Sequence, residues 1–514
     1  MRPSWRGSTD RNARSLAFNT IAQSSPLMIG YLASFLSAPI VLGGLGLRAF
    51  GIWALTGALV QYVNLLDFGV GQVLVRFVAL YDAEGARDAI GEVLGVGFAT
   101  IATVAVVLVG GSWATAGALA HDLGGISPTN MRTLLLCSSW MVCAAMLVNV
   151  MTAYPIGLRR MVAPNVAKSA GASVNFLFSI SAILISPHLV VYALANAAAS
   201  FVTVLIVMGV TLAMRPRLPL GFPQVARLWN LLRFSAQNQI LSLASLVNFQ
   251  SDKVVLALLV SPSAAGAYEL SNRVAAAARE VGVFTTSAMI PTFTARRATS
   301  SRAALASLYE RLTKQSSALA FPALILTATL APLILAAWLG TRPPHSTTIL
   351  IALSLAYIVN TTTGVGNALA YADGKPGISA RSASVTAIAN IVLTVTLAPA
   401  FGVWGVMTGT IIALTGGAVY QVALVHRHFK IPIRQYRDAT FPTFAMAVAL
   451  AVPASTVVAL SLGLGRWLQA VMCVVLAVCY LSCYSYAAMR MGAMPTAITR
   501  LLPWRKAAVL DAKS

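Results

Sequence analysis

The sequence predicts an all-α polytopic membrane protein with about fourteen transmembrane helices, arranged as two six-helix lobes and two additional C-terminal helices. Three observations lead to this fold class: long apolar runs between short polar loops, basic residues concentrated in alternate loops, and a weak internal repeat. Of the 514 residues, 58% are hydrophobic and 10% are charged, whereas a soluble domain carries about 25% charged residues. The short alternating segments typical of a transmembrane β-barrel do not occur in this sequence.

The apolar runs are each long enough to cross about 30 Å of hydrocarbon at roughly 1.5 Å per residue. We expect spans at 15–42, 50–78, 89–115, 131–156, 166–186, 189–213, 232–260, 265–293, 316–340, 347–371, 378–399, 404–426, 440–463 and 467–489. The loops between them are too short for a nucleotide-binding domain, and the sequence lacks a G-x-x-x-x-G-K-[ST] phosphate-binding motif. We therefore expect that this chain does not itself use ATP.

Basic residues are distributed asymmetrically over the loops. If both termini are cytoplasmic, 29 of the 36 Lys and Arg residues lie on the cytoplasmic side, and the opposite side has only Arg48, Arg132, Arg342 and Arg466. Cytoplasmic loops carry such an excess, so the pattern predicts fourteen spans with both termini cytoplasmic. A net charge of +22 would suggest nucleic-acid binding in a soluble protein, but the placement in loops excludes that partner.

The internal repeat consists of two matches at one offset. FGIWAL at 50–55 recurs as AGAYEL at 265–270, and SVNFLFSISAIL at 173–184 resembles AIANIVLTVTLAP at 387–399. Gly51 and Gly266 are 215 positions apart, and so are Asn175 and Asn390. Duplication of a six-span unit would produce parallel repeats related by a pseudo-two-fold axis along the membrane normal; chance similarity between apolar helices is the alternative. We predict an N-terminal lobe at 1–218, a C-terminal lobe at 219–430, and two additional helices with a cytoplasmic tail at 431–514.

The three basic residues that belong to neither set of loops are Lys253, Arg273 and Arg279. They lie in the stretch 248–280, which we predict to be the end of one span, a six-residue turn and most of the next span. An ionisable group in mid-membrane costs roughly 2.5–3.5 kcal/mol, so such groups usually face a protein interior or a water-filled cavity.

Acidic residues in the same stretch offer partners for these cations. Glu269 precedes Arg273 by four positions, the favourable order for a local ion pair on a helix. Asp252 is a candidate partner for Arg273 or Arg279, and an ion pair that only joins helices is the competing interpretation. Arg279 has no evident local partner, because the adjacent Glu280 points about 100° away around a helix.

These observations suggest a cationic site. Guanidinium groups bind oxyanions in a bidentate manner, and Lys253, Arg273 and Arg279 are candidates for binding a polyphosphate head group. Asp67 in the second span is either an acid facing the same cavity or an acid packed between helices. Amide side chains in spans one and seven, among them Gln23 and Asn238, suit sugar hydroxyls or hydrogen bonds between helices. No metal-binding motif is present, and we expect no cofactor.

Three segments resemble the bacterial polysaccharide-transport family, the O-antigen-type flippases of lipid-linked oligosaccharides: Leu45–Ala79, Ser251–Ala278 and Gly366–Ala413. This family belongs to the superfamily that also contains the MATE drug exporters and the lipid II flippase. The residues that carry the resemblance are Gly51 with Trp53, Asp67 with Gly69, Asp252, Gly266 with Tyr268, Arg273, and Gly402 with Gly405.

The resemblance implies two six-helix lobes around a central cationic cavity, working by alternating access in the bacterial plasma (inner) membrane. The substrate would be an undecaprenyl-diphosphate oligosaccharide, such as an O-antigen precursor of lipopolysaccharide, moved from the cytoplasmic to the outer face. Glycan polymerases and glycosyltransferases would be the protein partners, and the chain would not be an enzyme. Fourteen spans resemble the lipid II flippase, in which the two extra helices help to form a groove for the lipid tail.

Two other functions remain open at this stage. A MATE-type exporter of cationic drugs favours an acidic, aromatic cavity, whereas the intramembrane charges here are mainly basic. A membrane glycan polymerase or ligase needs a catalytic residue in a sizeable outer loop, and the sequence has no such loop. The energy source is also open: membrane potential acting on an anionic head group, or H⁺ or Na⁺ countertransport through Asp67 or Asp252.

Overall fold

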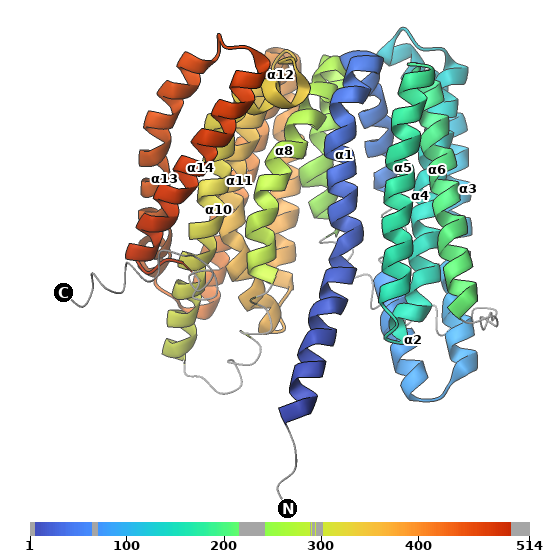
Figure 1. Ribbon diagram of the computed structural model, residues 1–514, viewed down its shortest axis with the longest axis horizontal. Coiled ribbons are helices and arrows are strands. Elements are labelled where there is room, and N and C mark those ends of the chain that lie inside the picture. The colour runs from blue at the N-terminus through green and yellow to red at the C-terminus, as the bar shows by residue number, and fades with distance from the viewer. Residues whose placement is uncertain are drawn as a thin grey trace, which may run out of the picture. The chain divides into compact units, whose positions relative to one another are not determined.

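The computed structural model describes residues 6–63, 70–214, 242–287 and 302–494, together with Met289 and Phe293. At positions 6–24, 63, 70–73, 87, 287, 302 and 303 only the backbone is described. All regular secondary structure in these ranges is helical (Figure 1). The helices are α1 (Arg6–Val63), α2 (Val70–Ala83), α3 (Arg87–Leu123), α4 (Pro128–Gly157), α5 (Val162–Ile185), α6 (Leu189–Met214), η2 (Leu256–Val260), α8 (Pro262–Ser287), α10 (Arg302–Leu339), α11 (Ser346–Ala372), α12 (Gly377–Phe429), α13 (Ile433–Ser461) and α14 (Arg466–Arg490).

The predicted fold class is confirmed. Eleven helices within the described ranges are long and apolar enough to cross a membrane. Two of them contain a sharp kink. The helix α1 is kinked at Gly46 (φ 77°) and covers the first predicted span and the beginning of the second. The helix α12 is kinked at Gly402 (φ 55°) and covers the eleventh and twelfth predicted spans. The expected loops at 43–49 and 400–403 are therefore kinks, which glycine permits because it adopts positive φ without strain. The eighth predicted span corresponds to α8, whose charged residues leave it outside that set of eleven.

The chain forms two compact units, Met1–Leu246 with Ser261–Gly266, and Val247–Val260 with Ala267–Ser514. In the first unit, α4 packs against α3 and α6, and α5 packs against α1 and α6. In the second unit, α10 packs against α11, α13 and α14, and α11 packs against α12. The predicted lobe boundary at 218/219 lies outside the described residues.

Within the first unit, backbone crosses backbone at two glycines that the repeat places at equivalent positions. A Cβ atom at Gly51 would lie 1.7 Å from the carbonyl oxygen of Pro262, and one at Gly266 would lie 2.6 Å from that of Leu47. Neither position has room for a side chain, so the close approach of α1 to the first turn of α8 requires glycine at both.

Three of the four basic residues predicted for the outer side have structural partners. Arg48 donates from Nη2 to the carbonyl oxygens of Leu123 at 2.9 Å and Gly124 at 3.1 Å, at the C-terminal end of α3. In the second unit, Arg466 donates in the same way to Ala337 and Trp338 near the end of α10. The guanidinium of Arg132 lies 3.9 Å from the ring centroid of Trp113. Cations at helix C-termini satisfy unpaired carbonyl groups, which accounts for arginine on the side that is otherwise nearly free of basic residues.

The two segments of α12, on either side of Gly402, pack against each other as antiparallel helices. A Cβ atom at Gly417 would lie 1.8 Å from Oγ1 of Thr386, and Ser382 Oγ donates to the Gly417 carbonyl oxygen at 3.1 Å. Small residues at such contacts allow membrane helices to approach closely. The beginning and the end of α12 consequently lie at the same end of the second unit.

The last two helices, α13 and α14, lie side by side at one edge of the second unit (Figure 1). Tyr480 OH donates to the Ala447 carbonyl oxygen at 2.8 Å, and Lys314 of α10 donates to the Met491 carbonyl oxygen at 2.8 Å. Large apolar side chains on their remaining faces are exposed, such as Trp467 at 82%, as expected of helices that face lipid.

Candidate functional site

The charged stretch is formed by two successive helices with one residue between them. The helix Ser242–Val260 ends in the π-helical turn η2, and α8 begins at Pro262 directly after Ser261. The predicted six-residue turn is therefore wrong. Ser261 Oγ accepts a hydrogen bond from the Ala264 amide at 3.1 Å, and a serine N-cap followed by proline is a favoured helix start. This Ser-Pro pair is the sequence signal that the prediction missed.

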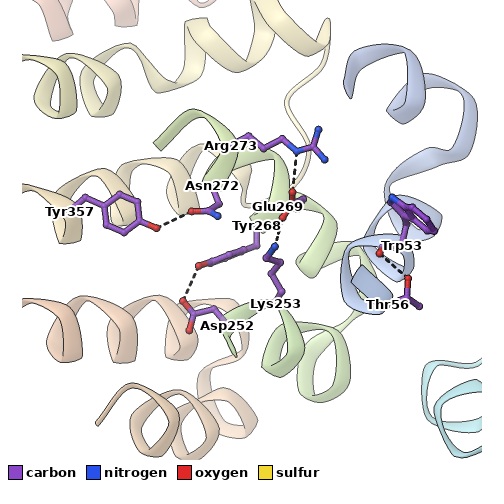
Figure 2. Close-up of polar contacts among 9 residues, drawn as sticks. All are labelled: Trp53, Thr56, Asp252, Lys253, Tyr268, Glu269, Asn272, Arg273 and Tyr357. Carbon is purple, nitrogen blue, oxygen red and sulfur yellow. Dashed lines mark hydrogen bonds and ion pairs between the residues drawn. The ribbon is translucent and has the colours of Figure 1, made fainter. Parts of the chain in front are cut away.

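Lys253, Glu269 and Arg273 form one ion cluster in the second unit (Figure 2). Lys253 Nζ lies 2.6 Å from Glu269 Oε2, and Arg273 Nε donates to Glu269 Oε1 at 3.0 Å. The side chains are 8%, 16% and 25% exposed, respectively. The predicted i,i+4 ion pair is present, and the structure adds Lys253 from the preceding helix. One carboxylate is thus shared by two cations.

Asp252 is next to Lys253 in sequence but belongs to a different arrangement. Its side chain is completely buried, and Oδ2 accepts from Tyr268 OH at 3.0 Å and from Thr410 Oγ1 at 2.9 Å. Thr410 Oγ1 also lies 2.9 Å from the Val406 carbonyl oxygen, so its one hydrogen is divided between two acceptors. The hypothesis that Asp252 pairs with Arg273 or Arg279 is wrong. Asp252 and Lys253 are successive residues on a helix and point in different directions, so Asp252 faces the Thr410 hydroxyl of α12 and not the ion cluster.

Buried acceptor oxygens without hydrogen-bond partners lie along the same helix. Oδ1 of Asp252 is one, and Oδ1 of Asn248, one turn earlier on that face, is another. Asn390 of α12 donates to the Asn248 carbonyl oxygen at 3.4 Å and also leaves its own Oδ1 without a partner. Because a buried acceptor without a partner costs about 1–3 kcal/mol, these oxygens mark a place where a proton or a cation would stabilise the folded chain.

Arg279 lies apart from the ion cluster, in an aromatic setting. Its Cζ is 4.0 Å from the ring centroid of Phe249 and 5.2 Å from that of Tyr357, and Nη2 is 3.3 Å from Glu280 Oε1. The expectation that Glu280 cannot reach Arg279 is wrong, because long side chains span the angular separation. The buried Nε has no hydrogen-bond partner, so Arg279 keeps one donor unused within the described part of the chain.

The remaining predicted site residues cannot be placed. Asp67 and Asn238 lie outside the described residues, and Gln23 belongs to α1 but its side chain is not described. Residues that the charge pattern did not single out are the hydroxyl donor Thr410 and the rings of Phe249 and Tyr357. Tyr357 also donates to Asn272 Oδ1 at 2.9 Å (Figure 2). Thr410 is 158 positions from Asp252, so no local signal in the sequence connects them.

This arrangement combines two chemical capabilities in one unit of a membrane-spanning fold. A partly accessible cluster that contains two cations can attract an anion, and its guanidinium can bind an oxyanion in two places. A buried carboxylate without a cationic partner among the described residues can take up a proton or a metal cation. Both groups lie in helices of a membrane-spanning fold.

Comparison with known proteins identifies the family. Residues 16–296 match the family model described as polysaccharide biosynthesis protein. That match covers more than half of the chain, so the protein belongs to this family, as the resemblance predicted. A search of curated proteins gives no significant match.

Solved structures confirm the fold. The lipid II flippase MurJ in an inward closed conformation aligns with a TM-score of 0.66 at 14% identity, over 90% of this chain and 100% of MurJ. An inward-facing multidrug resistance transporter of the MATE family, in the MOP superfamily, aligns with a TM-score of 0.64 at 15% identity, over 80% of this chain and 98% of the transporter. A MATE structure in complex with MaL6 aligns with a TM-score of 0.54 at 15% identity, over 80% of this chain and 96% of that chain.

Proposed function

We propose that this protein is a flippase that moves a polyprenyl-diphosphate-linked oligosaccharide, of the O-antigen type, from the cytoplasmic to the outer face of the bacterial inner membrane by alternating access. The observation that carries the proposal is that two cations, Lys253 and Arg273, share the carboxylate of Glu269 within the membrane-embedded part of the chain. Membership of a polysaccharide biosynthesis family and a fold shared with a lipid II flippase support it. Both termini are cytoplasmic in this proposal, and glycan polymerases or glycosyltransferases are the partner proteins.

The diphosphate is the part of such a substrate that most needs the protein. Transfer of an isolated anion into an apolar medium is prohibitive, whereas an anion that is paired and hydrogen-bonded can cross. In the resting cluster, the two cations share Glu269. An arriving diphosphate competes with Glu269 for Arg273, whose planar guanidinium matches two phosphate oxygens. Arg279, with its unused Nε, adds a second donor group on the same helix.

Asp252 is our candidate for coupling transport to H⁺ or Na⁺. Its Oδ1 is buried and has no hydrogen-bond partner, and its Oδ2 is held by two neutral hydroxyls rather than by a cation. A buried carboxylate is costly when charged, so it favours a bound proton or a cation. Release of that ion on one side of the membrane and rebinding on the other would link the ion gradient to the movement of the two lobes.

Reconstituted vesicles provide the test. The full-length protein is incorporated with a fluorescent polyprenyl-diphosphate saccharide, and the fraction that reaches the outer leaflet is measured with a membrane-impermeant quencher. We expect Arg273→Ala/Arg279→Ala to slow translocation by at least about tenfold, the effect of ~1.4 kcal/mol. The matched control is Arg434→Ala, which removes an arginine whose side chain is 80% exposed and paired with Asp438.

Equal translocation by the wild type and by the double variant would overturn the cationic-site proposal. Transport of a lipophilic cationic drug in the same vesicles, with no movement of the saccharide lipid, would instead establish the MATE-type alternative. Elongation of the saccharide, measured on the recovered lipid, would point to a glycan polymerase.

A further inference from the structure

A pocket of about 480 Å³ lies where the beginning and the end of α12 meet, and Gly377, Ile378, Arg381, Leu424, Arg427 and His428 line it. It lies entirely within the second unit and contains none of the residues proposed to bind the transported substrate. The loops at both ends of α12 are among those that the charge distribution assigns to the cytoplasm. The pocket therefore belongs at the cytoplasmic surface of the membrane.

The two arginines in this pocket have no acidic partner among the described residues. The contact that the structure shows for Arg381 is with the Tyr420 ring, 6.0 Å from its guanidinium. Within the described part of the chain, Arg427 makes no side-chain ion pair or hydrogen bond. The acid nearby, Asp373, has other neighbours: it lies 3.7 Å from Lys375 Nζ and 3.7 Å from His428 Nε2. Two unpaired guanidiniums in one pocket repel each other, and an anion between them would remove that repulsion.

The N-terminus of α12 strengthens the preference for an anion. The helix begins at Gly377 in the pocket wall, and no side chain caps its first turn. The first amide groups of a helix carry a partial positive charge and donate to phosphate oxygens. The glycine also leaves the backbone accessible, since nothing lies within 4 Å of the position that its Cβ atom would occupy.

Apolar stripes connect this pocket with the membrane interior. From Arg381, the positions on the same helix face are Val385, Ile388 and Val392, which are 45%, 65% and 53% exposed. From Arg427, the corresponding face of the other segment continues to Val419 and Ile412, which are 59% and 53% exposed. Residues at intervals of three, four and seven share a helix face, so each arginine stands at the end of an exposed apolar stripe. A phosphate in the pocket would have hydrocarbon chains in line with both stripes.

We propose that this pocket binds the phosphate of an anionic phospholipid of the cytoplasmic leaflet, with its acyl chains along the two apolar stripes of α12. Basic residues at this surface attract anionic lipids, and the paired geometry of charge and apolar surface distinguishes a lipid from a free phosphate. The site is independent of the proposed transport function, because it uses a different helix end and a resident lipid rather than the transported one.

Native mass spectrometry of the full-length protein in detergent tests this proposal. Dioleoyl phosphatidylglycerol is titrated against dioleoyl phosphatidylcholine, and we expect preferential retention of the anionic lipid. Arg381→Gln/Arg427→Gln should weaken its binding by about tenfold or more, since each basic side chain near the surface contributes to the attraction. The matched control is Arg434→Gln/Arg437→Gln, which removes two basic residues from the same side that already pair with Asp438.

Further measurements identify the ligand and exclude misfolding of the variant. Dihexanoyl phosphatidylglycerol and inorganic phosphate carry the charge without long chains, and we expect both to compete poorly. Competition by phosphate at the same concentration as the long-chain lipid would overturn the lipid assignment, as would equal lipid binding by both double variants. If the unfolding temperature of Arg381→Gln/Arg427→Gln equals that of the wild type, the loss of lipid binding is due to the missing arginines and not to misfolding. Loss of lipid retention with normal saccharide translocation leaves the proposed transport function intact.

Discussion

Two intramembrane acids in the second unit, Asp252 and Glu269, lie on consecutive helices but have opposite surroundings. Glu269 lies between two cations, Lys253 at 2.6 Å and Arg273 at 3.0 Å. Asp252 accepts hydrogen bonds from two neutral hydroxyls and keeps one oxygen without a partner. Both acids are expensive in a membrane if left alone, and the chain stabilises them by different means.

The difference suggests different tasks. Glu269 is a fixed anion whose charge the neighbouring cations require, so it governs the net charge of the ion cluster. Asp252 has no cation to release and can gain or lose a proton or metal ion without breaking an ion pair. We therefore propose that Glu269 compensates the neighbouring cations and exchanges with the substrate, and that Asp252 couples transport to an ion. Substitutions at the two sites and their neighbours should separate these roles.

The largest effect is expected from Glu269→Gln. It removes the carboxylate that Lys253 and Arg273 share in a largely buried position, which should lower the free energy of unfolding by about 3 kcal/mol or more. Lys253→Met in the same chain should restore most of this loss, because one cation then disappears with the anion. Thermal unfolding in detergent measures both. If Glu269→Gln alone were as stable as the wild type, the carboxylate of Glu269 would not stabilise Lys253 and Arg273 in the fold.

Asp252→Asn should change transport more than stability. The amide is nearly the same size and still accepts from Tyr268 and Thr410, and no cation is left unpaired. We expect dependence of translocation on the H⁺ or Na⁺ gradient to fall by about tenfold, equivalent to ~1.4 kcal/mol, with little change in the unfolding temperature. Translocation measured with and without each gradient tests this. Undiminished gradient dependence would remove Asp252 from the coupling role.

Removal of one hydroxyl donor should have an intermediate effect on stability. Tyr268→Phe leaves Asp252 Oδ2 with Thr410 alone, and we expect a loss of about 1–3 kcal/mol because the acceptor is buried. Tyr357→Phe is the matched control, since that hydroxyl bonds to the amide of Asn272 and not to a carboxylate. It should cost less, roughly 1 kcal/mol. Equal losses in chemical unfolding would mean that the charge of Asp252 has no influence on its hydrogen bonds.

Arg273→Lys should have the smallest effect on stability and a distinct effect on substrate. The positive charge next to Glu269 remains, so unfolding should change by only about 0.5 kcal/mol, the typical value of an i,i+4 pair. The planar fork that matches two phosphate oxygens is lost, so the concentration of saccharide lipid for half-maximal transport should rise. If that concentration stays constant while stability falls, Arg273 serves the fold and not the substrate.

The Glu269–Arg273 pair and its neighbours show what local pattern can predict. Four-residue spacing on a helix places the two side chains together whatever the rest of the fold does, and this pair is present as expected. Arg279 shows the limit, because its contacts with Phe249 and Tyr357 depend on which helices pack beside it. The prediction for Asp252 failed for the same reason. Its hydroxyl partners come from α8 and α12, and the arginines that are near in the sequence are not its partners.

By itself, the sequence determined the all-helical membrane fold, the approximate positions of its spans, its family, and the presence of charges within the membrane. These depend on hydropathy, loop charge and helix spacing, which act over a few tens of residues at most. Only the tertiary structure decided which acid receives cations and which receives hydroxyls. It also decided that α12 bends at Gly402 and brings Arg381 and Arg427 to one pocket. Such contacts join residues far apart in the chain, and packing between helices selects them.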